Sequence, residues 1–210
     1  MLWGGHEGGL ELRKRASGAL ALHGRFPYGK RAVLSDGGRT GRPRKEVIAP
    51  KAFAYRVEKP DEDIHFLIGH SYDRPLASRG AGTLDLTDTD EALTFVATIT
   101  EDMQDVSWVR DFLAALAAGL IVGLSPGFRV PPERAVKDAE TIEDEGYDPE
   151  NGAHNALIRT VHAALLYELS AVTRPAYSEA QIEARNWQAS DGDLIRPRSD
   201  MAQAARRWRA

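Results

Sequence analysis

Polar and apolar residues alternate along much of the chain, with the period of two that is typical of half-buried strands. Two such runs, 83–89 and 93–100, are rich in threonine and flank an acidic turn, so they predict a β-hairpin. Further strands are predicted at 18–26, 47–48, 64–69, 121–130 and 156–173, the last with a break or bulge near Ala163 and Ala164.

A different spacing, of three and four residues, predicts one long helix from Ser107 to Gly119. Its apolar positions are Val109, Phe112, Leu113, Leu116 and Leu120. Pro50 favours a short helical turn, and Pro175 favours a second helix that runs to about Arg185. Many strands and few helices predict a mostly β fold, an antiparallel barrel or sandwich with helices packed outside it.

The region 131–154 lacks this periodicity and is strongly acidic, which predicts a long loop. The loop is interpreted either as a solvated insertion or as a lid that orders on substrate binding, and both readings stay open. We expect a flexible N-terminal segment at 1–16, one domain at 17–186 and a polar, arginine-bearing C-terminal tail at 187–210.

The composition of the chain excludes several kinds of partner and of reactive site. The 210 residues carry a formal net charge of −4, which predicts no general attraction to nucleic acid or to an anionic membrane. The chain has no secretory signal pattern at its start and no apolar run near the roughly 20 residues that span a bilayer. It has no cysteine, which excludes disulfides, thiolate zinc sites and a cysteine nucleophile, and which suits a reducing interior such as a bacterial cytoplasm.

Three segments place a reactive side chain at a strand end or inside an apolar strand. His70 follows the apolar run 64–69, and Ser125 lies in an apolar strand between Gly123 and Gly127. Small neighbours would let a substrate backbone approach a nucleophile. Glu168 lies within an apolar strand, where a carboxylate needs an arginine or a histidine as partner. Each segment alone is also compatible with a structural role.

Together the three residue types suit nucleophilic catalysis. A serine hydroxyl is almost wholly protonated at neutral pH, so a histidine must remove its proton during attack. A carboxylate behind the histidine fixes its tautomer and stabilises the imidazolium. Composition alone does not show that the three residues meet.

Over about residues 17–185, the order of histidine motif, helix, serine motif and glutamate motif resembles the prohead protease family of tailed phages and phage-like particles. The segments 123–128 and 168–176 carry most of this resemblance. It implies a fold related to the herpesvirus assemblin proteases, a β-barrel surrounded by helices. It also implies Ser125 as nucleophile, His70 as general base and Glu168 as third member of a triad. Two departures from the family are Ser71, where an acidic residue is common, and Pro126, where a small or flexible residue is expected.

Two assignments within this site stay open. His162 is an alternative third member, because the assemblin relatives use a second histidine and because positions 162 and 168 share a face on an uninterrupted strand. A carboxylate is the better partner electrostatically, since it offsets the charge of the imidazolium. For the oxyanion, Arg174 resembles in placement an arginine of the assemblin proteases, and Arg129 is the rival on the strand of Ser125.

The resemblance implies a serine endopeptidase that acts inside an immature capsid in the host cell. Its substrates would be scaffold segments of the major capsid protein and the protease itself, with no metal or organic cofactor, and it leaves a homo-oligomer open. One alternative is an inactive head-assembly or scaffolding module of the same fold. Another is a metal-dependent hydrolase, although no spacing here resembles a metal site.

Overall fold

The computed structural model describes residues 11–14, 18–121, 123–148, 150 and 152–176. Its elements, in chain order, are β1 (Glu11–Lys14), β2 (Leu20–Pro27), β3 (Arg31–Ser35), β4 (Arg44–Ile48), α1 (Ala54–Val57), β5 (His65–Ile68), β6 (Ser71–Ser78), β7 (Leu84–Asp88), β8 (Ala92–Ile99), α2 (Glu101–Gln104), α3 (Ser107–Ala117), β9 (Gly123–Arg129), β10 (Glu140–Asp144), β11 (Tyr147–Asp148), β12 (Ala153–His154), β13 (Leu157–Val161) and β14 (Leu165–Val172).

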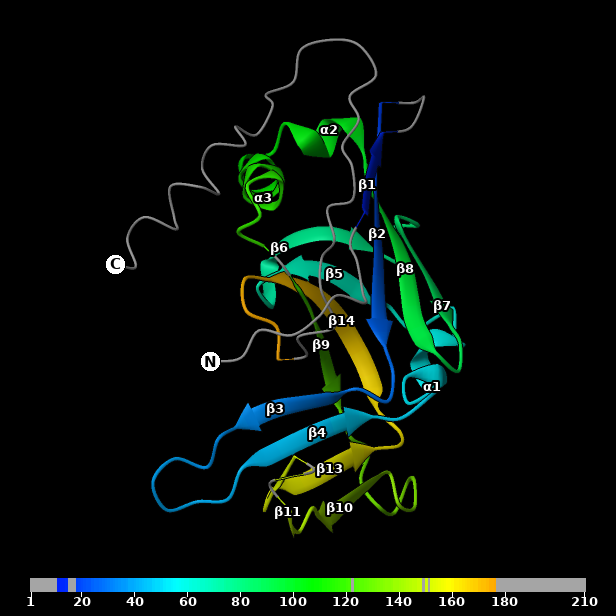
Figure 1. Ribbon diagram of the computed structural model, residues 1–210. Helices are drawn as coiled ribbons and strands as arrows, with labels where there is room; N and C mark the ends of the chain where they lie inside the picture. Colours follow the sequence, from blue (N-terminus) through cyan, green and yellow to red (C-terminus); the bar gives the residue numbers. More distant parts are fainter. Residues whose placement is uncertain (1–10, 15–17, 122, 149, 151, 177–210) are drawn as a thin grey trace, which may run out of the picture.

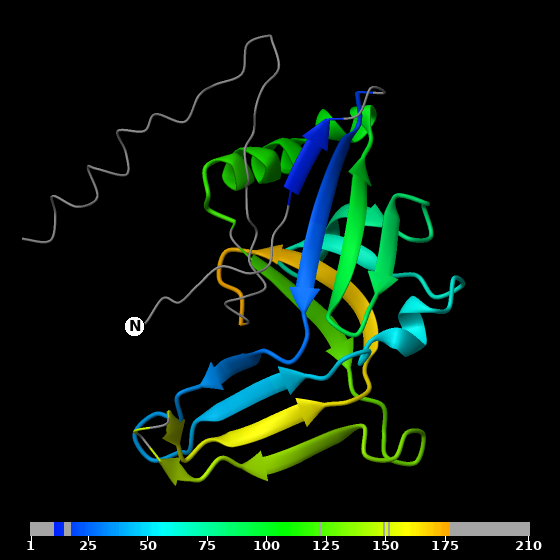
Figure 2. The ribbon, with the colours of Figure 1, turned by 45° about the vertical axis from the view of Figure 1, so that its right-hand side comes forward.

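The described strands form three four-stranded sheets and one two-stranded sheet. Their orders are β1-β2-β8-β7, β6-β5-β14-β9 and β10-β13-β4-β3, with β11-β12 as the small one. Figures 1 and 2 show the sheet of β3, β4, β13 and β10 at one end of the molecule, below the other two. The protein is therefore mostly β with few helices, as predicted. Among the described strands, the pairs do not close into a barrel.

The main core lies between the β1-β2-β8-β7 sheet and the β6-β5-β14-β9 sheet. Phe95 of β8 and Phe66 of β5 meet there with ring centroids 4.9 Å apart. Phe53, just before α1, packs against Phe128 of β9 at 5.6 Å. Leu169 of β14 belongs to the same buried cluster. One face of the β6-β5-β14-β9 sheet therefore packs in the core. Side chains on the other face of this sheet do not pack in the core.

The helix predicted from the three- and four-residue spacing is α3. Val109, Phe112 and Leu116 are buried on its inner face, as the spacing predicts. The helix ends at Ala117 because Gly119 adopts a left-handed backbone with φ of 69°. Leu120, expected on the apolar face, lies beyond this turn and is 64% exposed. None of the described helices has the length and apolarity needed to cross a membrane.

The region 131–154 is not the long loop that its composition predicts. Residues 140–144 form β10, which pairs antiparallel with β13 at the edge of its sheet. The charged residues of β10 point outward or lie at this edge, and an edge strand keeps its solubility through such charges. The acidic residues therefore belong to an exposed edge strand, and β3 and β6 were also absent from the predicted strands.

The predicted strand 156–173 is two strands in two sheets. The predicted break at Ala163 and Ala164 is confirmed, because β13 ends at Val161 and β14 begins at Leu165. β13 pairs in parallel with β4, and β14 pairs in parallel with β5, so the fold is less uniformly antiparallel than expected. In the N-terminal segment predicted to be flexible, residues 11–14 form β1 on β2. The predicted helix after Pro175 and the tail at 187–210 lie outside the described residues, apart from Pro175 and Ala176.

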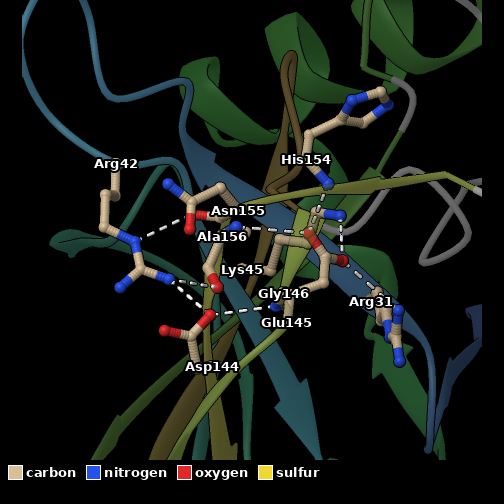
Figure 3. A network of polar contacts seen from close by, with 9 residues as sticks. All are labelled: Arg31, Arg42, Lys45, Asp144, Glu145, Gly146, His154, Asn155 and Ala156. Atoms are coloured by element: carbon tan, nitrogen blue, oxygen red, sulfur yellow. Dashed lines mark hydrogen bonds and ion pairs between the residues drawn. The ribbon is translucent and has the colours of Figure 1, made fainter. Parts of the chain in front are cut away.

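A polar clamp holds the outer ends of β4, β10 and β13 together (Figure 3). The Glu145 side chain, only 4% exposed, receives a hydrogen bond from Lys45 Nζ and forms an ion pair with Arg31 at 3.5 Å. Its other oxygen accepts hydrogen bonds from the backbone N–H groups of His154 at 3.0 Å and Ala156 at 3.3 Å. Every oxygen of this carboxylate therefore has a donor, and the clamp is a structural feature of the sheet.

The clamp predicts a loss of stability in acid. The hydrogen bond from Lys45, followed by that from the His154 backbone, lowers the pKa of Glu145 from 4.5 to about 2. A carboxyl group with a lowered folded pKa stabilises the fold above its unfolded pKa, and this contribution disappears as the pH falls from about 4.5 toward 2. We expect the midpoint of urea unfolding to fall over that range, and to fall less steeply in Glu145→Gln. Glu143→Gln, on the exposed part of β10, is the matched control, and an equal flattening in both variants would contradict the prediction.

Candidate active site

The strand β14 presents two different faces because its side chains alternate. Leu169 and Ala171 point into the main core. Glu168 and Ser170 point to the opposite face of the sheet, yet their exposures are only 4% and 0%. Two buried polar side chains on one face must find partners there. Those partners come from the turn between β5 and β6.

His70 occupies a tight turn that folds back over β14. Ile68 and Ser71 are paired across β5 and β6, so Gly69 and His70 are the two residues of the hairpin loop. Their φ angles are 58° and 62°, which is the left-handed pair that a type I′ hairpin requires. Glycine adopts this backbone freely, but a histidine there is uncommon and must be held by its surroundings.

Backbone contacts hold this turn against β14. The N–H of Gly69 donates to the Ala171 carbonyl at 3.0 Å, and the N–H of His70 donates to Ser170 Oγ at 2.9 Å. With the turn in this position, His70 Nδ1 lies 2.7 Å from Glu168 Oε1. The His70 side chain is 48% exposed, whereas that of Glu168 is 5% exposed. The structure therefore provides Glu168 with a histidine partner that is open to solvent on one side.

The carboxylate of Glu168 lies over a glycine of the neighbouring strand. Glu168 is paired with Gly127 of β9, and a β-carbon added at Gly127 would lie 1.9 Å from Glu168 Oε1. The other oxygen, Oε2, accepts a hydrogen bond from Ser170 Oγ at 2.6 Å. The sequence suggested that glycines beside Ser125 make room for a substrate. The structure assigns the space at Gly127 to Glu168 itself.

Ser125 lies on the same face, next to this group. It is the direct partner of Ser170 across β9 and β14, and opposite side chains of such a pair lie about 4.5–5.5 Å apart at their β-carbons. Ser125 is half-buried, and its hydroxyl makes no hydrogen bond to any described residue. Pro175 packs over Gly123, at the other side of Ser125. Ser125 thus lies between Pro175 and the Glu168 carboxylate on the strand β9.

The residues predicted as alternatives lie elsewhere or at the rim. His162 is in the link between β13 and β14, where its Nε2 is 3.0 Å from Thr141 Oγ1 of β10. The argument that placed it on the face of Glu168 assumed an uninterrupted strand, and the strand is interrupted. Arg129 and Arg174 are both exposed. Arg129 lies at the end of β9 beyond Gly127, and Arg174 precedes the proline that covers Gly123.

Other groups nearby shape the electrostatics of this face. Partial burial raises the pKa of the Tyr72 phenol on β6, and the negative charge of Glu168 raises it further. The Arg56 guanidinium opposes this effect and lies 4.4 Å from the centroid of the Tyr167 ring. The Tyr72 phenol therefore holds its proton more strongly than a free phenol does. Within the part of the chain that the structure describes, no group of three or more acidic or histidine side chains could hold a metal ion.

Sequence reasoning missed Ser170. It lies two residues after Glu168 on one strand, so period-two alternation alone places both on the same face. That signal was present in the motif 168–176, but the sequence does not show that the His70 turn covers this face. The missing information was the pairing of β5 with β14.

Comparison with known proteins found a matching family. A family model described as "Caudovirus prohead serine protease" matches residues 36–193, which include the three segments of His70, Ser125 and Glu168. No curated protein and no solved structure matches the chain.

Proposed function

Because this chain belongs to the caudovirus prohead serine protease family, we propose that it is itself an active serine endopeptidase that acts during capsid maturation. The observation that carries the proposal is the hydrogen-bonding distance of 2.7 Å between His70 and the buried Glu168, on the sheet face that also bears Ser125. A buried carboxylate that holds a half-exposed imidazole beside a serine without a hydrogen-bond partner among the described residues suits acyl transfer.

In the proposed reaction, Ser125 Oγ attacks the carbonyl carbon of the scissile peptide bond while His70 Nε2 takes its proton. Glu168 Oε1 accepts the Nδ1–H, fixes the tautomer and stabilises the imidazolium. The imidazolium then gives its proton to the leaving amine as the C–N bond breaks, which leaves the acyl group on Ser125. Water attacks this ester with His70 again as base, and His70 returns the proton to Ser125 Oγ as the ester bond breaks and the carboxylate product leaves. His70 and Ser125 make no hydrogen bond to each other within the described chain, and such bonds often tighten only when substrate is bound.

The negative oxygen of the tetrahedral intermediate needs donors near Ser125. Pro126 lacks a backbone N–H and cannot be one of them. Arg174 and Arg129 are the proposed side-chain donors, and their backbone positions lie near opposite ends of β9. The packing of Pro175 on Gly123 supports Arg174, because it fixes the residue next to Arg174 beside the strand of the nucleophile.

The family supports a capsid protein as substrate and a place inside the procapsid. More specifically, we propose cleavage of the scaffold segment of the major capsid protein and of the protease itself, in the host cytoplasm. The domain 17–186 would carry this activity. The relation to the assemblin proteases and their barrel stays a prediction, because the described strand pairs form separate sheets.

A fluorophosphonate probe tests the proposal directly, since it reacts with a serine only where a neighbouring base activates it. We expect stoichiometric labelling of the full-length protein at Ser125, located by mass spectrometry of the tryptic peptides. Ser125→Ala should not be labelled, and Ser35→Ala, an exposed serine of β3, should label like the unchanged protein. EDTA should have no effect. Absence of label on folded protein would favour an inactive head-assembly module, and loss of activity with EDTA would favour a metal-dependent hydrolase.

A further inference from the structure

The fully buried hydroxyl of Ser170 contacts both Glu168 and His70 of the proposed site. It is 0% exposed. Its Oγ lies 2.6 Å from Glu168 Oε2 and 2.9 Å from the backbone N of His70. A serine hydroxyl has one proton and two lone pairs, and an ionised carboxylate only accepts. The Ser170 proton therefore goes to Glu168, and a lone pair of Ser170 accepts the N–H of His70.

Both bonds act on the orientation of the base. The bond to Oε2 fixes the plane of the carboxylate, so that Oε1 faces His70 Nδ1 at 2.7 Å. The bond from the His70 backbone holds a residue whose φ of 62° is uncommon for a histidine. The Ser170 side chain thus links the Glu168 carboxylate to the backbone of His70. The position of Glu168 relative to His70 depends on this link.

We propose that Ser170 is a positioning residue for the His70–Glu168 pair in the proposed proteolytic reaction, on which this inference rests. It does not act as a rival nucleophile to Ser125, because its proton is directed to Glu168 and no solvent reaches it. Without it, Glu168 Oε2 loses its hydrogen-bond donor and the carboxylate is free to turn. His70 Nδ1 then loses its fixed acceptor for part of the time, which lowers the population of the competent base.

Kinetics of peptide cleavage test this role with Ser170→Ala and Ser170→Thr. We expect kcat of Ser170→Ala to fall by roughly 10- to 100-fold with KM within about twofold, because the substrate does not touch Ser170. Ser170→Thr retains the hydroxyl and should keep more of kcat than Ser170→Ala. Leu169→Val is the matched control, since it trims the adjacent buried residue, whose side chain packs in the core on the face of β14 opposite to Glu168 and Ser170. Its kcat should stay within about twofold.

A spectroscopic measurement separates positioning from a general loss of packing. In the inactive Ser125→Ala background, the Nδ1–H of His70 should give a low-field proton resonance, because it is shared with a carboxylate. We expect this resonance to broaden or move upfield when Ser170→Ala is added, and to stay in place when Leu169→Val is added. An unchanged resonance together with unchanged kcat in Ser170→Ala would overturn the proposal.

Failure of the proposed function and failure of the role of Ser170 give different results. Peptide cleavage that survives in Ser125→Ala rejects the proposed function and this role with it. Cleavage that is lost in Ser125→Ala but unchanged in Ser170→Ala rejects the role of Ser170 alone. If Ser170→Ala and Leu169→Val lower kcat equally, and in proportion to their loss of unfolding free energy, Ser170 has only a structural role and the inference is wrong.

Discussion

Ser125→Ala and His70→Ala should each reduce cleavage of the capsid substrate by about 10⁴-fold or more, and the double variant should be no worse than either single one. Members of a triad act as a unit, so removal of one member removes most of what the others contribute. Co-expression of each variant with the capsid protein, followed by gel analysis of the processed band, measures the effect. The folded state should persist, because Ser125 makes no hydrogen bond to a described residue and the His70 side chain is half exposed.

His162→Ala is the informative control for this experiment. His162 contacts Thr141 of β10 and lies in the link before β14, so its removal should leave cleavage within about threefold of the unchanged protein. If His162→Ala loses as much activity as His70→Ala while Glu168→Gln retains it, His162 is the third member and the present assignment is wrong. Full processing by Ser125→Ala would exclude the serine mechanism altogether.

Gly127→Ala should lower kcat by roughly 100-fold or more, although it adds a single methyl group to an otherwise unreactive residue. The new β-carbon would lie 1.9 Å from Glu168 Oε1, so the carboxylate has to move away from the position in which it meets His70. A misplacement of about 1 Å in a catalytic group costs on the order of 100-fold in rate. Steady-state peptide cleavage measures the effect, with KM expected to change little.

A double-mutant cycle tests whether the loss of kcat in Gly127→Ala is caused by displacement of Glu168. If it does, Gly127→Ala combined with Glu168→Gln should be no slower than Glu168→Gln alone, because the displaced group no longer contributes. Additive losses would mean that Gly127 acts on substrate approach, as its sequence context first suggested. In that case the structural reason given for this glycine is wrong.

The local pattern of polar and apolar residues was sufficient to predict the elements that bury one face and expose the other. The period of two at 84–99 predicted the β7–β8 hairpin, and the three- and four-residue spacing predicted α3. The buried position of Glu168 also followed from its apolar neighbours, together with its need for a partner. These predictions succeeded because the buried face of an element can be recognised from the apolar residues of that element alone.

Predictions failed where one composition is compatible with two structures. The acidic residues of 140–144 suit a disordered loop and an edge strand equally, and only a neighbour such as β13 decides between them. The sequence predicts a strand end at Gly69–His70 rather than a tight turn, because the type I′ geometry depends on the pairing of β5 with β6. The start of β6 was missed for the same reason.

The mostly β class, the family and the three reactive residue types at His70, Ser125 and Glu168 can be predicted from the sequence, since they depend on residue order and local period. Which of these residues lie next to one another depends on how the strands pair. The parallel pairing of β14 with β5 brings the His70 turn over Glu168, and the antiparallel pairing with β9 sets Ser125 beside Ser170. Strand pairing joins residues about 50 to 100 positions apart, and its energy comes from backbone hydrogen bonds and shared burial, which no single segment encodes.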